Sequence, residues 1–341
     1  MDGPVAAADA PRGDLVSDPA GRTDVLRRLD RRFQVVAGKG GVGRSVVAAT
    51  LARRLAARGH RTLLLEVNAP DSAARFLGVE PAVDVPREVL DGLFLCRMTP
   101  AGAMKEYALL VLRFKALYQL VFENRLVKYL LRSIPSLAEF TMMGKVWYHA
   151  TERGPDGRPR FDRIVLDAPA TGHAITMLAV SRLVADTVPG GPMRDAAEKM
   201  AALVEDASDA CLHLVTLPEE MPVTEALELD AQRGARLRMA AGIGIVNRCR
   251  PALLAPGEHA LVDALAASAD PRVAPFVATA RGRSFRESLE AEHRARFVRG
   301  LGAPVITLPE ASGQDGVALT DTLTAALDAA LGDAPARRET P

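Results

Sequence analysis

A glycine-rich segment with two cations constrains the fold of this 341-residue chain more than any other stretch. Residues 38–45 read Gly-Lys-Gly-Gly-Val-Gly-Arg-Ser. The β-branched run at 32–37 predicts a strand before them, and the apolar spacing of residues 45–58 predicts a helix after them. Glycines let such a backbone turn its N–H groups toward a polyphosphate at the positive end of the helix. We therefore predict a phosphate-binding loop; the alternative is a turn that only caps the helix.

The loop departs from the common pattern G-x-x-x-x-G-K-[ST] at one position. Arg44 stands where a lysine usually reaches the β- and γ-phosphates. Arginine keeps the positive charge, but its guanidinium is planar and larger than an ammonium group, so the exchange is not conservative. The hydroxyl of Ser45 is the predicted Mg²⁺ ligand. The predicted nucleotide contacts in this segment are Gly38, Lys39, Gly40, Gly41, Val42, Gly43, Arg44, Ser45 and Val46.

A second part of the site follows the apolar strand predicted at 163–168. Asp167 stands at the carboxyl end of that strand, where nucleotides bind to parallel sheets, and it can hold a Mg²⁺-bound water. The alternative is an acid that caps the next turn. At Gly172 a backbone N–H can approach a γ-phosphate and move when that phosphate leaves. For His173 we favour a structural hydrogen bond over catalysis, whereas the amide of Asn247 suits the edge of adenine.

The composition argues against several other classes of function. Hydrophobic residues make up 48% of the chain and charged residues 25%, as in ordinary globular proteins. Because the net charge is +1, we predict neither nucleic acid nor an anionic membrane as the main partner. Cys96, Cys211 and Cys249 form no C-x-x-C pair, so a disulfide framework or a cysteine zinc site is not expected. The sequence shows no membrane span and no secretory signal, which predicts a cytoplasmic protein.

Short apolar strands alternate with helical segments along the chain. This order predicts an α/β fold with a doubly wound, mostly parallel sheet of about seven or eight strands and helices on both faces. The predicted strands are 32–37, 62–67, 94–98, 163–168, 211–216, 242–247 and 304–308, with a weaker candidate at 273–277. The segment 104–151 predicts a helical insertion, which either packs on the core or binds a partner. We expect residues 1–23 and 332–341 to be disordered tails of one P-loop domain at 24–331.

Three of these segments together resemble the motifs of one family. They are residues 38–45, the switch-like Asp-Ala-Pro-Ala-Thr-Gly-His at 167–173, and the proline-containing segment 133–139. The chain is similar to the arsenical pump-driving ATPase (ArsA) and the ATPases that target tail-anchored proteins. These belong to the deviant-Walker-A group with MinD, ParA and the nitrogenase iron protein. The resemblance covers about residues 32–310 and implies a P-loop ATPase that uses ATP and Mg²⁺.

The resemblance also implies roles for single residues. Lys39 falls at the signature lysine, which in such proteins reaches across a dimer to the phosphates bound by the other subunit. Asn247 falls at the adenine-contacting asparagine, and Pro309 lies in a loop that borders the base. A charge contributed in trans couples hydrolysis to subunit closure, as an arginine finger does. The resemblance therefore implies a homodimer, or a heterodimer with a paralogous ATPase.

Four departures from the family pattern change what we expect. Arg44 replaces the usual second lysine, and Asn68 falls where the family often has an aspartate that orients the attacking water. Asparagine can position water but cannot take its proton, so we expect slow turnover. The chain has no C-x-x-C pair for zinc or arsenite, and the stretch 173–211 has no room for a long methionine-rich insertion. Classical tail-anchored-protein targeting is therefore disfavoured.

Three hypotheses remain open. The first is an ATP-hydrolysing switch that dimerises and acts on a protein client through its helical insertion, with Lys39, Arg44 and Asn68 as the catalytic residues and Ser45 and Asp167 at the metal. The second is a hydrolysis-poor regulatory subunit that binds nucleotide and pairs with an active homologue. The third is a MinD- or ParA-like positioning ATPase, which the lack of a basic stretch disfavours.

Overall fold

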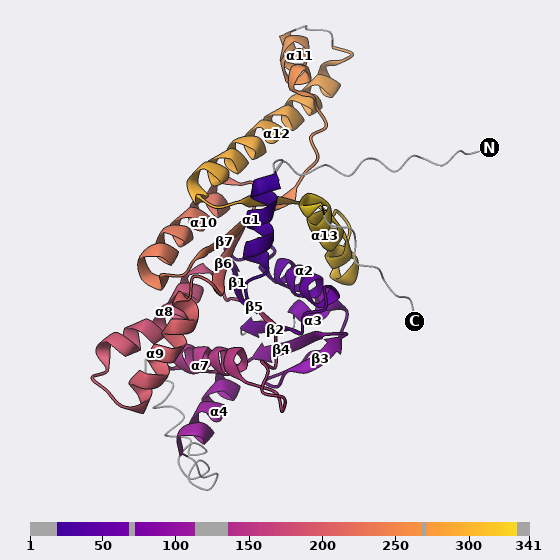
Figure 1. The fold of residues 1–341 in the computed structure, drawn as a ribbon. Helices are drawn as coiled ribbons and strands as arrows, with labels where there is room; N and C mark the ends of the chain where they lie inside the picture. The colour runs from indigo at the N-terminus through magenta and orange to yellow at the C-terminus, as the bar shows by residue number, and fades with distance from the viewer. Residues whose placement is uncertain (1–18, 68–71, 113–135, 268–270, 333–341) are drawn as a thin grey trace, which may run out of the picture.

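The computed structural model describes residues 19–67, 72–112, 136–267 and 271–332. These ranges form one eight-stranded sheet with helices on both faces (Figure 1). The strands are β1 (Phe33–Gly38), β2 (Thr62–Val67), β3 (Arg87–Leu90), β4 (Leu93–Met98), β5 (Arg163–Asp167), β6 (Ala210–Thr216), β7 (Ala241–Cys249) and β8 (Val305–Pro309). Their order across the sheet is β3-β4-β2-β5-β1-β6-β7-β8. All neighbouring pairs are parallel except β3 with β4, which confirms the predicted fold class.

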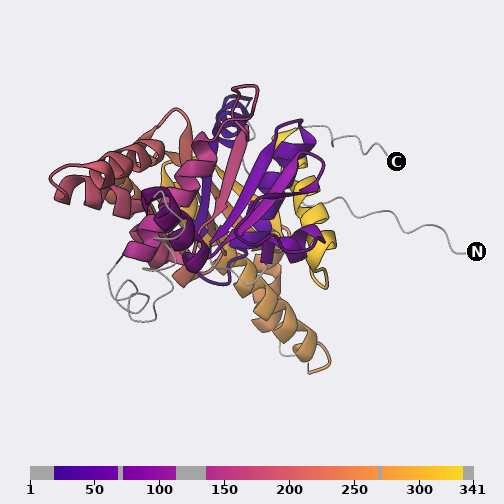
Figure 2. The same ribbon diagram turned by 90° about the horizontal axis from the view of Figure 1, so that it is seen from below.

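Helices connect these strands along the chain. They are α1 (Pro19–Leu29), α2 (Arg44–Ala57), α3 (Ser72–Leu77), α4 (Pro100–Leu112), α7 (Leu137–Thr151), α8 (Thr171–Thr187), α9 (Pro192–Glu205), α10 (Glu220–Gln232), α11 (Pro256–Ala267), α12 (Ala274–Leu301) and α13 (Gly316–Leu331). A short π-helical turn, η1 (Arg233–Leu237), continues α10. Both ribbon views show α11 and the adjoining part of α12 projecting from the body (Figures 1 and 2).

Two apolar cores lie on the two faces of the sheet. On one face, alternate residues of the strands pack against α7, α8, α9, α10 and the C-terminal end of α12. On the other face, the remaining strand residues pack against α1, α2, α3 and α13. β1, β2 and β6 are buried at every position, which explains why their sequences are mostly apolar rather than alternating. The central strands are therefore held rigidly, and their carboxyl ends lie at one edge.

The predicted strands occur in the structure within two residues at either end, with one exception. The segment 273–277 is wrong as a strand: Val273 caps α12, and residues 274–277 form its first turn. Val273, Phe276 and Val277 are residue types common in strands, but Pro275 argues against a strand and fits the first turn of a helix, where no N–H donor is needed. The sequence analysis also missed β3, an antiparallel edge strand of four mostly exposed residues with no apolar run.

The domain boundaries differ from the expectation at the N-terminus. Helix α1 begins at Pro19, inside the range 1–23 that was expected to be disordered, and Val25 and Leu29 in the same helix are buried against the core. The helical insertion predicted at 104–151 includes the end of α4 and all of α7. Within α7, Phe140 and Met143 lie in the core, so this part of the insertion packs on the sheet domain. Residues 113–135 of the predicted insertion lie outside the described residues.

Among the helices that the structure describes, none is both long enough and apolar enough to cross a bilayer.

Candidate nucleotide site

The glycine-rich loop lies at the carboxyl end of β1, near the middle of the sheet. β1 pairs with β5 on one side and β6 on the other, and α2 starts at Arg44 directly after the loop. Gly43 serves as the cap residue of α2 in a left-handed conformation, with φ of 91°. The N-terminus of a 14-residue helix therefore points at the loop, and its free N–H groups favour an anion there.

Two glycines of the loop sit where a side chain has no room. A Cβ atom added at Gly38 would fall 2.2 Å from the carbonyl oxygen of Val215 in β6. One added at Gly43 would fall 2.3 Å from Nδ2 of Asn247 in β7. The loop is thus wedged between neighbouring strands, and these glycines allow the close approach.

Replacing Gly43 by alanine is expected to weaken nucleotide binding about 10–100-fold. The substitution combines a left-handed backbone with a clash against Asn247, and such strain amounts to about 1–3 kcal/mol. Gly40→Ala is the matched control for loop stability, because a Cβ there meets no atom within 4 Å. Urea unfolding should show a lower midpoint for Gly43→Ala only. Equal midpoints and equal nucleotide affinity for Gly43→Ala and wild type would contradict this reading of the loop.

The predicted metal ligands meet at the end of β5. Asp167 is 3% exposed, and the hydroxyl of Ser45 hydrogen-bonds its carboxyl group. Burial raises the pKa of Asp167 to about 6, although the Ser45 hydrogen bond and the Arg44 charge act to lower it. The Oδ1 atom of Asp167 is buried and has no hydrogen-bond partner among the described residues. A buried, unsatisfied carboxylate oxygen beside a serine hydroxyl fits a hard cation such as Mg²⁺.

Arg44 joins the loop to the segment after β5. Its Nη1 atom donates a 2.5 Å hydrogen bond to the carbonyl oxygen of Ala168, the first residue after β5. Burial lowers the pKa of Arg44, while the nearby charge of Asp167 acts to raise it. Because the backbone of Ala168 leads directly into residues 169–173, the side chain of Arg44 links the phosphate loop to the predicted switch.

Lys39 is held by an acid of its own chain. Its Nζ atom lies 2.6 Å from Oε1 of Glu225 in α10, and the two side chains are 30% and 33% exposed. An exposed ion pair of this kind contributes little stability, about 0–1 kcal/mol. Breaking the ion pair between Lys39 and Glu225 would therefore change the stability of the isolated chain little.

The remaining predicted contacts lie near the ends of β7 and β8 and at the start of α8. Asn247 is 3% exposed, and its Nδ2 atom donates a 2.9 Å hydrogen bond to the carbonyl oxygen of Val42, so its amide supports the loop. Pro309 ends β8 and pairs with Cys249 at the end of β7. Gly172 lies in the first turn of α8, is exposed and has open space at its Cα. Asn68 lies outside the described residues.

Sequence reasoning missed two residues near the loop. Glu225 stands 186 positions from Lys39, and a lone acid on a helix carries no local signal of that contact. Glu66, the penultimate residue of β2, is 1% exposed, and its Oε1 atom accepts a hydrogen bond from the N–H of Ala73 in α3. An acid inside an otherwise apolar strand could have been noticed, because buried carboxylates need partners.

Two surface depressions lie away from the loop. One of about 460 Å³ is lined by Arg61, Glu152 and Arg160 among others, and one of about 380 Å³ by Arg61, Glu88 and Asp91 among others. Arg61 precedes β2, so both depressions lie at the amino-terminal edge of the sheet. Nucleotides bind parallel sheets at the carboxyl edge. Neither depression therefore coincides with the predicted nucleotide loop at the carboxyl end of β1.

The region that contains the loop is similar to known proteins. Residues 31–189, which include the loop, Asp167 and Gly172, match the profile of a family described as "Anion-transporting ATPase". ATPase BagA of Mycobacterium tuberculosis is 32% identical over 237 residues, which cover 67% of this chain and 68% of that protein. The chain belongs to the ArsA ATPase family.

More distant members of the ArsA family are longer than the matched region. The arsenical pump-driving ATPase of Escherichia coli is 28% identical over 222 residues, 61% of this chain but 33% of that protein. ATPase ARSA1 of Chlamydomonas reinhardtii is 28% identical over 211 residues, 52% of this chain and 26% of that protein. This ArsA-family chain thus spans about a third or less of these two relatives.

Proposed function

We propose that this chain binds Mg²⁺–ATP on residues 38–45 and hydrolyses it. The observation that carries the proposal is the buried carboxylate of Asp167, hydrogen-bonded by Ser45 and left with an unsatisfied oxygen at the start of α2. Most buried carboxylate oxygens have a hydrogen-bond partner, so the unsatisfied oxygen of Asp167 is available to a cation. Membership of the ArsA family supports an ATPase rather than another nucleotide-binding protein.

Each group has a distinct role in this proposal. The loop N–H groups and the N-terminus of α2 bind phosphate oxygens, and Ser45 and Asp167 hold Mg²⁺, which neutralises phosphate charge when bound. Arg44 turns from the Ala168 carbonyl toward the phosphates and so frees the segment 169–173 to move. Asn68 orients the attacking water without taking its proton. Asn247 keeps the loop in place through Val42.

We further propose that the active form is a dimer that acts on a protein client. Lys39 leaves Glu225 and reaches the phosphates of the other subunit, so closure of the dimer completes each site. Gly172 senses the γ-phosphate from the first turn of α8. The insertion at 104–151 is the proposed client surface, and its helix α7 packs on the sheet.

Phosphate release from Mg²⁺–ATP by the purified full chain tests this function. We expect steady turnover that requires Mg²⁺ and falls about 100-fold or more in Ser45→Ala, because one metal ligand is lost. Thr50→Ala, which removes a hydroxyl bonded only within α2 to Val46, serves as the control and should keep turnover near wild type. Turnover that survives Ser45→Ala unchanged would mean that contaminating activity or another site is being measured.

A regulatory, hydrolysis-poor subunit is the second candidate. Its support is the position of Arg44, whose guanidinium bonds the Ala168 carbonyl instead of projecting freely over the loop. In that case Mg²⁺–ATP binds tightly, but the homodimer releases no phosphate. A mixture with a paralogous ATPase would then change the turnover of that ATPase.

The double substitution Arg44→Lys with Asn68→Asp is expected to raise turnover several-fold. Lysine restores the smaller point charge at the phosphates, and aspartate restores a group that can accept the proton of the attacking water. Single-turnover measurements on the two single variants separate these effects. A fall in rate for the double variant would show that the site is adapted to arginine and asparagine.

A further inference from the structure

The hairpin formed by α11 and residues 274–291 of α12 projects from the body, and we call it the arm (Figures 1 and 2). The rest of α12 belongs to the body, where Phe297 and Leu301 are buried in the core beside Gly244 of β7. Few residues of the arm are buried: Val262 is 7% exposed and Ser284 is 8% exposed. The arm therefore adds almost nothing to the core that holds the nucleotide site.

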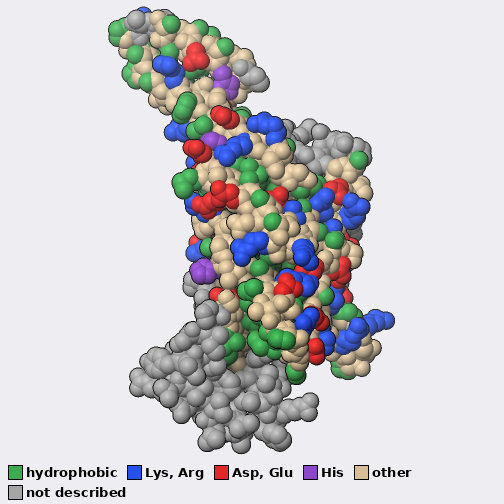
Figure 3. All heavy atoms as spheres, turned by 90° about the vertical axis from the view of Figure 1, so that its left-hand side faces the viewer, with side chains coloured by type: hydrophobic (Ala, Val, Ile, Leu, Met, Phe, Trp, Pro, Cys, Tyr) green, Lys and Arg blue, Asp and Glu red, His purple; other side chains and the backbone are tan. Residues whose placement is uncertain are grey.

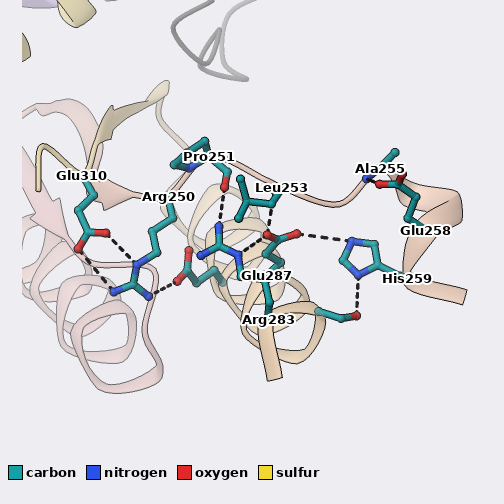
Figure 4. Close-up of polar contacts among 11 residues, drawn as sticks. Arg250, Pro251, Leu253, Ala255, Glu258, His259, Arg283, Glu287 and Glu310 are labelled. Carbon is teal, nitrogen blue, oxygen red and sulfur yellow. Dashed lines mark hydrogen bonds and ion pairs between the residues drawn. The ribbon is translucent and has the colours of Figure 1, made fainter. Parts of the chain in front are cut away.

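Polar contacts hold the arm in a fixed position (Figure 4). At its base, Arg250 contacts Glu310 at 2.8 Å and Glu290 at 3.0 Å, which ties α12 to the ends of β7 and β8. Glu287 accepts hydrogen bonds from the N–H of Leu253 and from Arg283. Burial acts to raise the pKa of Glu287, but these hydrogen bonds and the Arg283 charge outweigh it and lower the pKa. The carboxylate thus stays ionised in this network.

Within the arm, α11 and α12 contact each other through their inner faces. Nδ1 of His259 in α11 lies 2.7 Å from Oγ of Ser284 in α12, and Nε2 of His259 lies 3.8 Å from Glu287 (Figure 4). Arg283 also donates to the carbonyl of Pro251. Because Arg283, Ser284 and Glu287 face inward, the opposite side of α12 faces away from α11.

That outward side carries an apolar stripe at coiled-coil spacing. Ala278, Gly282, Phe285 and Leu289 follow one another at intervals of four, three and four residues, and all four are exposed. Phe285 is 69% exposed and Leu289 is 39% exposed. Intervals of four and three keep side chains on one narrow line of a helix, as at the a and d positions of a coiled coil. Hydrophobic side chains lie along the exposed surface of the arm in Figure 3.

Gly282 leaves room for another backbone to approach this stripe. A glycine inside an exposed helix destabilises it by about 1 kcal/mol relative to alanine. Nothing in the folded chain demands it, since a Cβ atom at Gly282 meets no atom within 4 Å. Small residues in a helix face let a second helix pack closely, and Ala278, one turn earlier, extends the small surface.

The charged residues beside the stripe indicate which kind of partner it can bind. Arg281 lies one turn from Ala278 and Phe285, and Arg286 lies one turn from Gly282 and Leu289, so one cation flanks each side. Among the acids of α12 near the stripe, Glu287 is turned inward to Leu253 and Arg283, and Glu290 contacts Arg250. Glu292 is exposed and lies one turn beyond Leu289, at the end of the stripe. Arg281 is 61% exposed and lies 3.8 Å from Asp263 of α11. The border of the stripe beside Ala278, Gly282 and Phe285 therefore carries two cations of α12.

We propose that the arm docks an α-helix of a partner protein whose apolar seam is bordered by Asp or Glu. The partner helix packs against Ala278, Gly282, Phe285 and Leu289, and its acids pair with Arg281 and Arg286. A second copy of this arm offers the same two arginines and no outward acid between residues 276 and 286. A membrane surface would call for a wider apolar face and more cations than a single narrow seam provides.

Fluorescence anisotropy with designed peptides tests this proposal on the full chain. The probe is a labelled three-heptad helix with leucine at a and d and glutamate at e and g; the control peptide has lysine at e and g. We expect the glutamate peptide to bind the wild-type chain at least about tenfold more tightly than the lysine peptide. The charge swap Arg281→Glu with Arg286→Glu should reverse that preference.

Further variants separate docking from misfolding. Phe285→Ser with Leu289→Ser should abolish binding, whereas Phe276→Ser should not, because Phe276 is 76% exposed but lies about half a turn around the helix from Phe285. Gly282→Gln should weaken binding while making α12 more stable. Circular dichroism and Mg²⁺–ATP binding report whether each variant is folded. None of the substituted residues is among those predicted to bind the nucleotide.

Several results would overturn the proposal. They are no binding of either peptide to the wild-type chain, equal binding of both peptides, and an unchanged preference after the charge swap. Self-association in sedimentation that is lost in Phe285→Ser with Leu289→Ser would assign the stripe to a second copy. Binding to phosphatidylserine vesicles that depends on Phe285 would assign it to a lipid surface.

Discussion

Asp167→Asn is expected to stabilise the ligand-free protein while abolishing its response to Mg²⁺–ATP. Asp167 is 3% exposed, and burial raises its pKa from 3.8 to about 6. At neutral pH the folded protein therefore holds an ionised carboxylate that is disfavoured by on the order of 3 kcal/mol relative to the unfolded chain. Asparagine removes that charge and keeps the shape, so the unfolding free energy should rise by about 1–3 kcal/mol.

The pH dependence follows from the direction of this shift. A carboxyl group with a raised pKa in the folded state favours folding below its unfolded pKa, and this contribution is lost as the pH rises through about 6. The stability advantage of Asp167→Asn should therefore be large at pH 8 and small near pH 4. Urea denaturation of the ligand-free protein at both values measures the difference.

Asp186→Asn is the matched control for this experiment. Asp186 lies near the end of α8, and its side chain is 63% exposed, so its replacement should change stability by less than about 0.5 kcal/mol at either pH. The wild-type chain should gain stability on addition of Mg²⁺–ATP, and Asp167→Asn should not. A destabilised Asp167→Asn that still responds to Mg²⁺–ATP would show that Asp167 is a structural acid.

Lys39→Ala is expected to reduce turnover by about 100-fold or more without changing the fold. Among the described residues Lys39 pairs only with Glu225, and both side chains are partly exposed, so stability should change by less than about 1 kcal/mol. In the proposed closed dimer, the same lysine would neutralise charge at the phosphates of the other subunit, as an arginine finger does. The loss in rate should therefore be much larger than the loss in stability.

Mixed dimers decide whether Lys39 acts in trans. A Lys39→Ala subunit keeps Ser45, and a Ser45→Ala subunit keeps Lys39, so one complete site forms only when the two are mixed. We expect each variant to be nearly inactive alone and the mixture to recover part of the wild-type rate. Glu225→Gln, which removes the carboxylate that holds Lys39, should raise the rate at low protein concentration. No recovery in any mixing ratio would place Lys39 in its own site or outside catalysis.

Local patterns in the sequence predicted most of the sheet and the position of the glycine-rich loop between β1 and α2. β1, β2 and β6 are mostly apolar because both faces of the sheet are covered, and Gly38 and Gly43 are required by the close approach of Val215 and Asn247. β3 escaped prediction because an edge strand of four mostly exposed residues has no apolar pattern. Residues 273–277 looked like a strand because β-branched content does not reveal that a long helix follows.

Contacts between distant parts of the chain were beyond prediction. The pairing of Lys39 with Glu225, the hydrogen bond from Arg44 to Ala168 and that from Asn247 to Val42 join residues more than 120 positions apart. Each depends on how the helices and strands pack, not on the sequence near either residue. The arm was likewise not anticipated, because its apolar stripe faces outward and resembles an ordinary core-facing pattern in the sequence alone.

Isothermal titration calorimetry of the full chain with ATP tests the central claim most directly. We predict saturable heat with one nucleotide per chain in the presence of Mg²⁺, much weaker binding when the metal is chelated, and little heat for Gly43→Ala or Asp167→Asn. Absence of heat with both Mg²⁺–ATP and Mg²⁺–ADP in the wild-type chain, or equal heat in the Asp167→Asn variant, would contradict the assignment of residues 38–45 and Asp167 as a nucleotide site.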